Sequence, residues 1–153
     1  MMDWLAQMLG LPDHFCFSSG KTGGGVIYGG ASEATMVGLM CARFQMLKAH
    51  GLDNNMSDED DAKAEAKYAV LNRLVAYTST QAHSSVEKAA LLNSTRIRIL
   101  PTDENLGLDV HALRGQIDAD KRKGLIPCIV IATLGSTNAC AFDNLQTIGK
   151  ICM

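Results

Sequence analysis

The C-terminal half of the chain alternates between short apolar runs and amphipathic segments. Three runs predict strands: 74–80, 95–101 and 125–136. The last is almost continuously apolar, which predicts a strand buried on both faces. Apolar residues at helical spacing predict three helices: 84–93, 109–124 and 143–152. Strand and helix in turn predict an α/β fold, with a mostly parallel sheet and flanking helices.

The helix that ends at Gly124 has the clearest boundaries. Asp109 is a good N-cap, and Val110, Leu113 and Ile117 share one apolar face that we expect to turn inward. Glycine ends helices because it adopts the left-handed conformation easily.

The N-terminal half is less regular. Residues 2–12 predict one short helix, with Asp3 as its N-cap and with Gly10 and Pro12 as stop signals. A brief apolar run between glycines follows at 25–30 and predicts a short strand.

A long helix is expected over 31–51. Its inward stripe is predicted from helical spacing: Val37, Met40, Cys41, Phe44 and Leu47. The acidic and then mixed run over 57–67 predicts a solvated helix start or a loop.

Composition narrows the class of protein. The 153 residues are 47% hydrophobic and 20% charged, which fits a single globular domain. The net charge of −2 and the lack of a basic stripe argue against nucleic acid as a partner. No apolar run is long enough to predict a membrane helix, so we expect no membrane contact. Five scattered cysteines predict reduced thiols and a cytoplasmic protein. No zinc-ligand spacing occurs, so no metal is expected.

Two familiar phosphate-binding motifs are incomplete around Gly20-Lys21-Thr22. A Walker loop would require a glycine at position 15, which is Phe15. The dinucleotide fingerprint would require a third glycine at Tyr28, and its glycines should follow a strand rather than precede one. Neither reading of the glycines is supported.

The second glycine pair, Gly29-Gly30, leads into Ala31 and Ser32 at the start of the long helix. The first amides of a helix and its dipole favour an anion, and a serine hydroxyl adds a donor. A phosphate would therefore bind at Ala31 and Ser32. Two other readings stay open: Ser32 caps the helix, aided by Thr35, or Ser32 is the nucleophile of a strand-to-helix elbow.

That elbow pattern would require glycine at Ala34, and His83 would be its base. His83 follows the strand at 74–80 and precedes the next helix, where ligands of α/β sheets gather. A structural histidine is an equally good reading. Ser84 and Ser85 are expected to cap the helix rather than act as nucleophiles. Ser136 and Thr137 follow another strand. Three strand ends are therefore expected to converge, and they carry Ala31 and Ser32, His83, and Ser136 and Thr137.

These residues, in this order, resemble the pyridoxal-phosphate-dependent group II amino-acid decarboxylases, the family of aromatic-L-amino-acid, histidine and tyrosine decarboxylases. The stretches that carry the resemblance are MDWLAQMLGLP, GGGVIYGGASEAT, LVAYTSTQAHSSVEKAALL, GLIPCIVIATLGSTNACAFDNL and IGKIC. They span nearly the whole chain.

The resemblance implies a fold-type-I large domain and a homodimer. It also implies that Ala31 and Ser32 bind the phosphate of pyridoxal 5'-phosphate, that His83 is the catalytic histidine stacked over the pyridine ring, and that Thr137 contacts the cofactor. Gly30 stands where relatives often carry Ser or Thr, and Ser136-Thr137-Asn138 where Thr-Thr is usual. Neither departure removes a matched residue.

The resemblance implies that residues 1–153 are one partial cofactor-binding domain, incomplete at both ends. The family's Schiff-base lysine and the aspartate on the pyridine nitrogen would lie after Met153, so Lys88 and Lys150 are not candidates. The expected reaction of the longer enzyme is decarboxylation of an aromatic L-amino acid to its amine and carbon dioxide.

Four alternatives remain: a histidine decarboxylase, a tyrosine decarboxylase, an aldehyde synthase, or a noncatalytic truncated chain. The resemblance implies that the synthases replace the histidine at position 83, so His83 favours decarboxylation. The 153-residue chain by itself is expected to be inactive.

Overall fold

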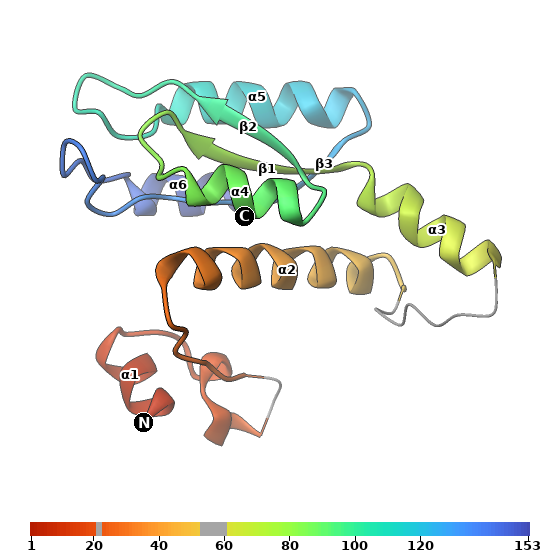
Figure 1. Ribbon diagram of the computed structural model, residues 1–153, viewed down its shortest axis with the longest axis horizontal. Coiled ribbons are helices and arrows are strands. Elements are labelled where there is room, and N and C mark those ends of the chain that lie inside the picture. Colours follow the sequence, from red (N-terminus) through yellow and green to blue (C-terminus); the bar gives the residue numbers. More distant parts are fainter. Residues whose placement is uncertain (21–22, 53–60) are drawn as a thin grey trace. The chain divides into compact units, whose positions relative to one another are not determined.

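The computed structural model describes residues 1–20, 23–52 and 61–153 (Figure 1). These residues form two compact units, Met1–Ala34 and Thr35–Met153. Lys21, Thr22 and the first part of the acidic run, 57–60, lie outside the described residues.

The first unit contains helix α1 (Met2–Met8) and two short 3-10 helices, η1 (Asp13–Phe15) and η2 (Phe17–Ser19). Gly10 ends α1 with a φ of 66°, as the sequence predicts. The N-cap prediction for Asp3 is wrong because α1 already begins at Met2. The Asp3 carboxylate instead accepts the backbone N–H groups of Phe17, at 2.7 Å, and of Ser18, at 3.0 Å. This carboxylate therefore ties η2 to α1.

The strand expected over 25–30 does not form. Residues 23–28 have no regular secondary structure, and the side chains of Val26 and Ile27 are 59% and 79% exposed. A strand needs a neighbour for its backbone groups, and no strand pairs with this run in the described parts of the chain.

The second unit is an α/β layer structure, which confirms the predicted fold class. Its elements are α2 (Ala31–Ala49, which begins in the first unit), α3 (Asp61–Leu71), β1 (Leu74–Ser79), α4 (Ser85–Leu92), β2 (Arg96–Leu100), α5 (Val110–Arg122), β3 (Ile126–Val130) and α6 (Leu145–Cys152). The strand order is β2-β1-β3, and β1 pairs in parallel with both neighbours.

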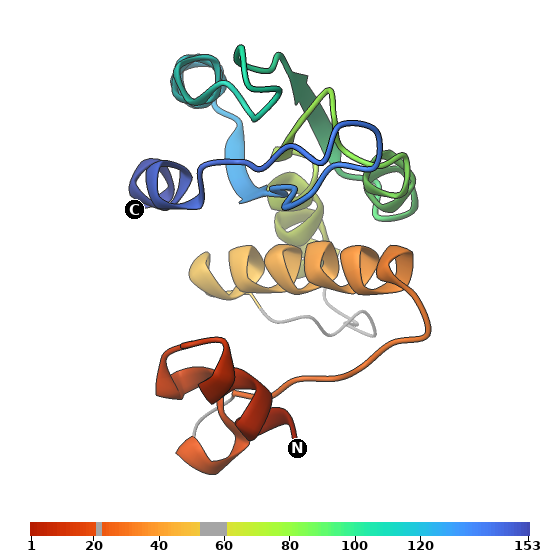
Figure 2. The same cartoon turned by 90° about the vertical axis from the view of Figure 1, so that its left-hand side faces the viewer.

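Helices cover both faces of β1. Val75 and Tyr77 pack with Leu113 and Ile117 of α5 and with Ile148 of α6. On the opposite face, Ala76 packs with Leu39 of α2 and with Ala89 and Ala90 of α4. Figure 2 shows α5 and α6 on one side of the sheet and α4 on the other. The alternating side chains of one strand thus build two separate cores.

The boundaries of α5 match the sequence prediction closely. The Asp109 carboxylate accepts the backbone N–H groups of His111, at 2.8 Å, and Ala112, at 3.1 Å. Leu113 is fully buried, and Gly124 follows the helix with a φ of 73°. A side-chain acceptor and a left-handed glycine therefore set the two ends.

The inward stripe predicted for the long helix is largely wrong. Leu39 and Leu47 are buried, whereas Met40 and Phe44 are 51% and 42% exposed. The helix carries apolar residues on nearly all sides, so spacing alone could not select its packed face. The small Ala76, together with α4, selects the face that carries Leu39.

The sequence predicts that the run 125–136 forms the strand buried on both faces, but in the structure that strand is β1. Every residue of β1 is buried, and every residue of β3 is half-buried. Among the described residues β3 pairs only with β1, so no strand pairs with its outer edge. The acidic run is predicted to be a helix start or a loop, and its described part from Asp61 onward does begin helix α3.

Candidate functional site

The turn at Gly29-Gly30 leads directly into α2, whose first residue is Ala31. The backbone N–H of Ala34 donates to the carbonyl of Gly30 at 3.2 Å. Ser32 therefore lies inside the first turn, and the reading of Ser32 as the N-cap is wrong. Its side chain is exposed and has no hydrogen-bond partner among the described residues.

Sequence reasoning missed the role of Glu33 at this turn. Its carboxylate accepts the backbone N–H of Gly30 at 3.1 Å. A glutamate three residues after the cap position is one half of a capping box, and this half can be read from the sequence; the glycine at position 30 has no side chain to form the other half. The amide of Gly30 is thus already paired with a carboxylate.

The nucleophile elbow at Ser32 is also wrong. That motif places the serine on a sharp turn between a strand and a helix, but the residues before Gly29 form no strand.

Ala31 and Ser32 belong to the first compact unit, and His83 and Thr137 to the second. The predicted meeting of Ala31 and Ser32 with His83 therefore stays a prediction.

His83 lies in the short connection between β1 and α4, as the sequence predicts. Its imidazole Nδ1 lies 2.9 Å from the Ser85 hydroxyl oxygen and 3.2 Å from the Ser85 backbone nitrogen. The histidine itself is exposed, while Ser85 is 7% exposed. One edge of the ring is therefore held by the buried first residue of α4.

The capping roles predicted for Ser84 and Ser85 are wrong. Ser84 occupies the N-cap position, but its side chain makes no capping hydrogen bond. The Ser85 hydroxyl contacts His83 instead, and the imidazole nitrogen accepts the Ser85 amide N–H in the way that a capping oxygen would. The histidine side chain thus serves as the cap.

Thr137 lies in the loop that follows β3, where it is exposed. Because β1 and β3 are adjacent and parallel, His83 and Thr137 both follow strands at the same edge of the sheet. The backbone around Thr137 is fixed on both sides. Ser136 Oγ accepts the N–H of Ala141 at 3.1 Å, and the N–H of Cys140 donates to the Ser136 carbonyl at 2.8 Å.

Asp143 anchors this loop, and sequence reasoning did not identify it. Its buried carboxylate accepts the backbone N–H of Thr133 at 2.7 Å and that of Leu108 at 2.7 Å. The same residue donates its own N–H to the Thr133 carbonyl at 3.0 Å. Asp143 therefore connects the loop after β3 to the segment before α5.

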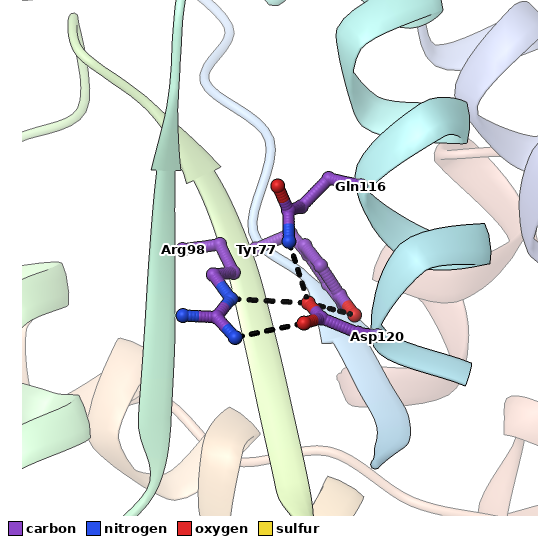
Figure 3. Close-up of polar contacts among 4 residues, drawn as sticks. All are labelled: Tyr77, Arg98, Gln116 and Asp120. Carbon is purple, nitrogen blue, oxygen red and sulfur yellow. Dashed lines mark hydrogen bonds and ion pairs between the residues drawn. The ribbon is translucent and has the colours of Figure 1, made fainter. Parts of the chain in front are cut away.

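A second buried carboxylate, Asp120 of α5, lies on the α5 face of the sheet (Figure 3). It accepts hydrogen bonds from Tyr77 of β1 at 3.1 Å, from Gln116 at 3.1 Å, and from two nitrogens of Arg98 of β2 at 2.7 and 3.0 Å. The Arg98 guanidinium is the main reason that the pKa of Asp120 is lowered to about 2. Burial raises the pKa of Tyr77 well above its usual value.

This cluster joins two strands and a helix, because Tyr77, Arg98 and Gln116 all donate to the one buried carboxylate of Asp120. We therefore interpret it as a structural cluster that holds these elements together.

Neither a metal cluster nor a membrane helix occurs within the described ranges. No group of three or more His, Cys, Asp or Glu side chains is placed to hold a metal ion. No helix there is both long and apolar enough to span a bilayer.

Comparison with known proteins gives a consistent match. The domain described as "Pyridoxal-dependent decarboxylase conserved domain" matches residues 1–153. Aromatic-L-amino-acid decarboxylase of Manduca sexta is 47% identical over 152 residues, which are 99% of this chain and 28% of that protein. Histidine decarboxylase of Mus musculus is 47% identical over 153 residues, which are 99% of this chain and 22% of that protein.

A solved structure, Oryza sativa TDC with PLP and tryptamine, is 37% identical with a TM-score of 0.77. The match covers 98% of this chain and 29% of that one. The chain therefore spans less than a third of the length of these proteins.

Proposed function

Because this chain belongs to the pyridoxal-dependent decarboxylase family, we propose that it forms part of an enzyme that decarboxylates an aromatic L-amino acid to its amine and carbon dioxide. The observation that carries the proposal is the 47% identity to an aromatic-L-amino-acid decarboxylase over 99% of the chain. The reaction is proposed for a polypeptide of the relatives' length that contains this sequence, here called the full-length enzyme.

The residues at the start of α2 have the chemistry that a phosphate group needs. A helix N-terminus favours an anion, and the exposed Ser32 hydroxyl can donate to it. A Cβ at Gly30 would meet no heavy atom within 4 Å, so the surface beside this turn is open. We assign the phosphate of pyridoxal phosphate to Ala31 and Ser32.

The residues at the carboxyl edge of the sheet fit the pyridine ring. His83 offers an exposed imidazole fixed along one edge, which suits stacking against a flat aromatic ring. Thr137 offers a hydroxyl on a loop that hydrogen bonds hold in place. When bound, pyridoxal phosphate supplies an electron sink for the electron pair left by departing carbon dioxide. His83 and Thr137 would keep the ring in a fixed plane.

We propose further that the full-length enzyme is a cytoplasmic homodimer. All five cysteines are free thiols in the structure, which suits a reducing compartment. The dimer follows from the resemblance to the family.

Histidine decarboxylation is the second candidate, because a histidine decarboxylase matches this chain with the same 47% identity. The aldehyde synthases of the family are a weaker candidate, since the resemblance implies that they lack the histidine present here as His83. Substrate choice therefore needs a direct product assay.

The test is a product analysis of the full-length enzyme with pyridoxal phosphate. Tryptophan, tyrosine, phenylalanine, dihydroxyphenylalanine and histidine are offered separately in air-saturated buffer. We expect one amine and one carbon dioxide per aromatic amino acid consumed, without hydrogen peroxide. Amine from histidine alone would favour the second candidate, and aldehyde with ammonia and hydrogen peroxide would identify a synthase. No carbon dioxide from any of them would refute the proposal.

A further inference from the structure

Ser85 contacts His83 through both its hydroxyl and its backbone amide, at 2.9 and 3.2 Å from the same imidazole nitrogen, Nδ1. We propose that Ser85 is a positioning residue that fixes the tautomer and the orientation of His83. The proposal rests on the proposed function, since it assigns a role to a residue beside the cofactor ring.

The backbone contact determines where the imidazole proton lies. A backbone N–H can only donate, so the Nδ1 that it contacts must present a lone pair. In a neutral imidazole the proton then resides on Nε2. The Ser85 hydroxyl is within hydrogen-bond distance of the same lone pair, so it too must act as the donor. Both donors of one residue thus favour the same tautomer.

The two donors sit on a rigid support. Ser85 is the first residue of α4, and Val86, Ala89 and Ala90 of that helix are buried. The two alanines pack with Ala76 of β1. Since α4 cannot rotate without taking these buried side chains out of the core, it fixes the position of Ser85.

The tautomer determines what the opposite edge of the ring, which carries Nε2, can bind. Nε2 lies across the imidazole from Nδ1, so it faces away from Ser85. Its N–H would offer a hydrogen-bond donor, not an acceptor, to a ligand at the edge of the sheet. Ser85 therefore determines which partner atoms His83 can bind: acceptor oxygens such as those of a carboxylate.

Ser84 provides a matched control. It is the same residue type in the adjacent position, it is exposed, and its side chain makes no capping bond. Ser84→Ala should therefore leave the imidazole unaffected, while Ser85→Ala removes one of the two donors. Ser85→Thr keeps the hydroxyl and should restore the wild-type tautomer of His83.

The experiment is ¹⁵N spectroscopy of histidine-labelled full-length enzyme without cofactor, with His83→Asn to assign the signals. We expect the Nε2–H form in wild type and in Ser84→Ala. The ratio of the Nδ1–H form to the Nε2–H form should rise about fivefold in Ser85→Ala, the effect of one lost hydrogen bond. Ser85→Thr should return the ratio to the wild-type value.

An Nδ1–H signal in wild type would overturn the proposal whatever the variants do. So would a Ser85→Ala spectrum identical to that of wild type. A titration with pyridoxal phosphate separates this test from the proposed function. If the wild-type protein shows the expected tautomer but binds no cofactor, the assigned function fails and the role of Ser85 as the residue that orients His83 stands.

Discussion

At the scale of single residues, the phosphate assignment depends on Ser32. An aspartate there would place a negative charge in the first turn of α2, beside the proposed phosphate. Ser32→Asp in the full-length enzyme should weaken binding of pyridoxal phosphate at least tenfold through charge repulsion, since ~1.4 kcal/mol corresponds to a factor of ten. The measurement is an absorbance titration with the cofactor.

Ser32→Asn is the matched control, because asparagine has nearly the same size as aspartate and carries no charge. We expect it to bind the cofactor much better than Ser32→Asp does. Equal occupancy in wild type and Ser32→Asp would contradict the placement of the phosphate.

Asp120 is the residue whose ionisation should matter most for stability. Its pKa is lowered to about 2 in the folded protein, from the usual 3.8. A lowered folded pKa means that the carboxylate stabilises the fold above about pH 4, and that this contribution is lost as the pH falls toward 2. The shift corresponds to about 2 kcal/mol.

The check compares urea-unfolding midpoints of the full-length enzyme and its Asp120→Asn variant at several pH values. The variant should be less stable at pH 7, and the gap should narrow as the pH falls below about 4. Asp118 lies on the exposed face of the same helix, so the Asp118→Asn variant should have the same unfolding midpoint as wild type at each pH. A gap that stays constant with pH would show that the carboxylate charge is not what stabilises this cluster.

At the scale of elements, α5 was predicted well because local signals set both of its ends. Asp109→Ala removes the acceptor of two backbone N–H groups and should destabilise the fold by about 1 kcal/mol. Thermal unfolding of the full-length enzyme measures this, and Asp109→Asn, which keeps an acceptor oxygen, should lose much less. Equal losses in the two variants would contradict the capping role.

The elements that were predicted poorly depend on neighbours far away in the sequence. The packed face of α2 is chosen by Ala76 and α4, and β1 is the buried strand because β2 and β3 flank it. Neither fact can be read from periodicity within a single segment. Partners such as Arg98 and Asp120 also come from different elements, so the cluster in Figure 3 was not foreseen.

Within the candidate site, the positions of His83 and Thr137 could be predicted, because parallel strands bring their carboxyl ends to one edge of the sheet. Their roles toward the cofactor stay predictions. The roles of Ser85 and Asp143 could not be predicted, since each depends on which loop atoms a short side chain reaches in the folded protein.

At the scale of the whole molecule, covalent binding of the cofactor is expected to depend on a lysine other than those of this chain. The family resemblance implies that neither Lys88 nor Lys150 has that role. We therefore predict that the 153-residue chain, mixed with the cofactor, shows no visible band of lysine-bound pyridoxal phosphate, whereas the full-length enzyme does. A band in the short chain would implicate a lysine such as Lys88 or Lys150.

A crystal structure of the full-length enzyme with pyridoxal phosphate would test the assignment of the cofactor site most directly. We expect the phosphate at the first turn of α2, on Ala31 and Ser32, with the His83 imidazole stacked on the pyridine ring and Thr137 in contact with the cofactor. A phosphate bound away from α2, or a ring that does not touch His83, would contradict this assignment.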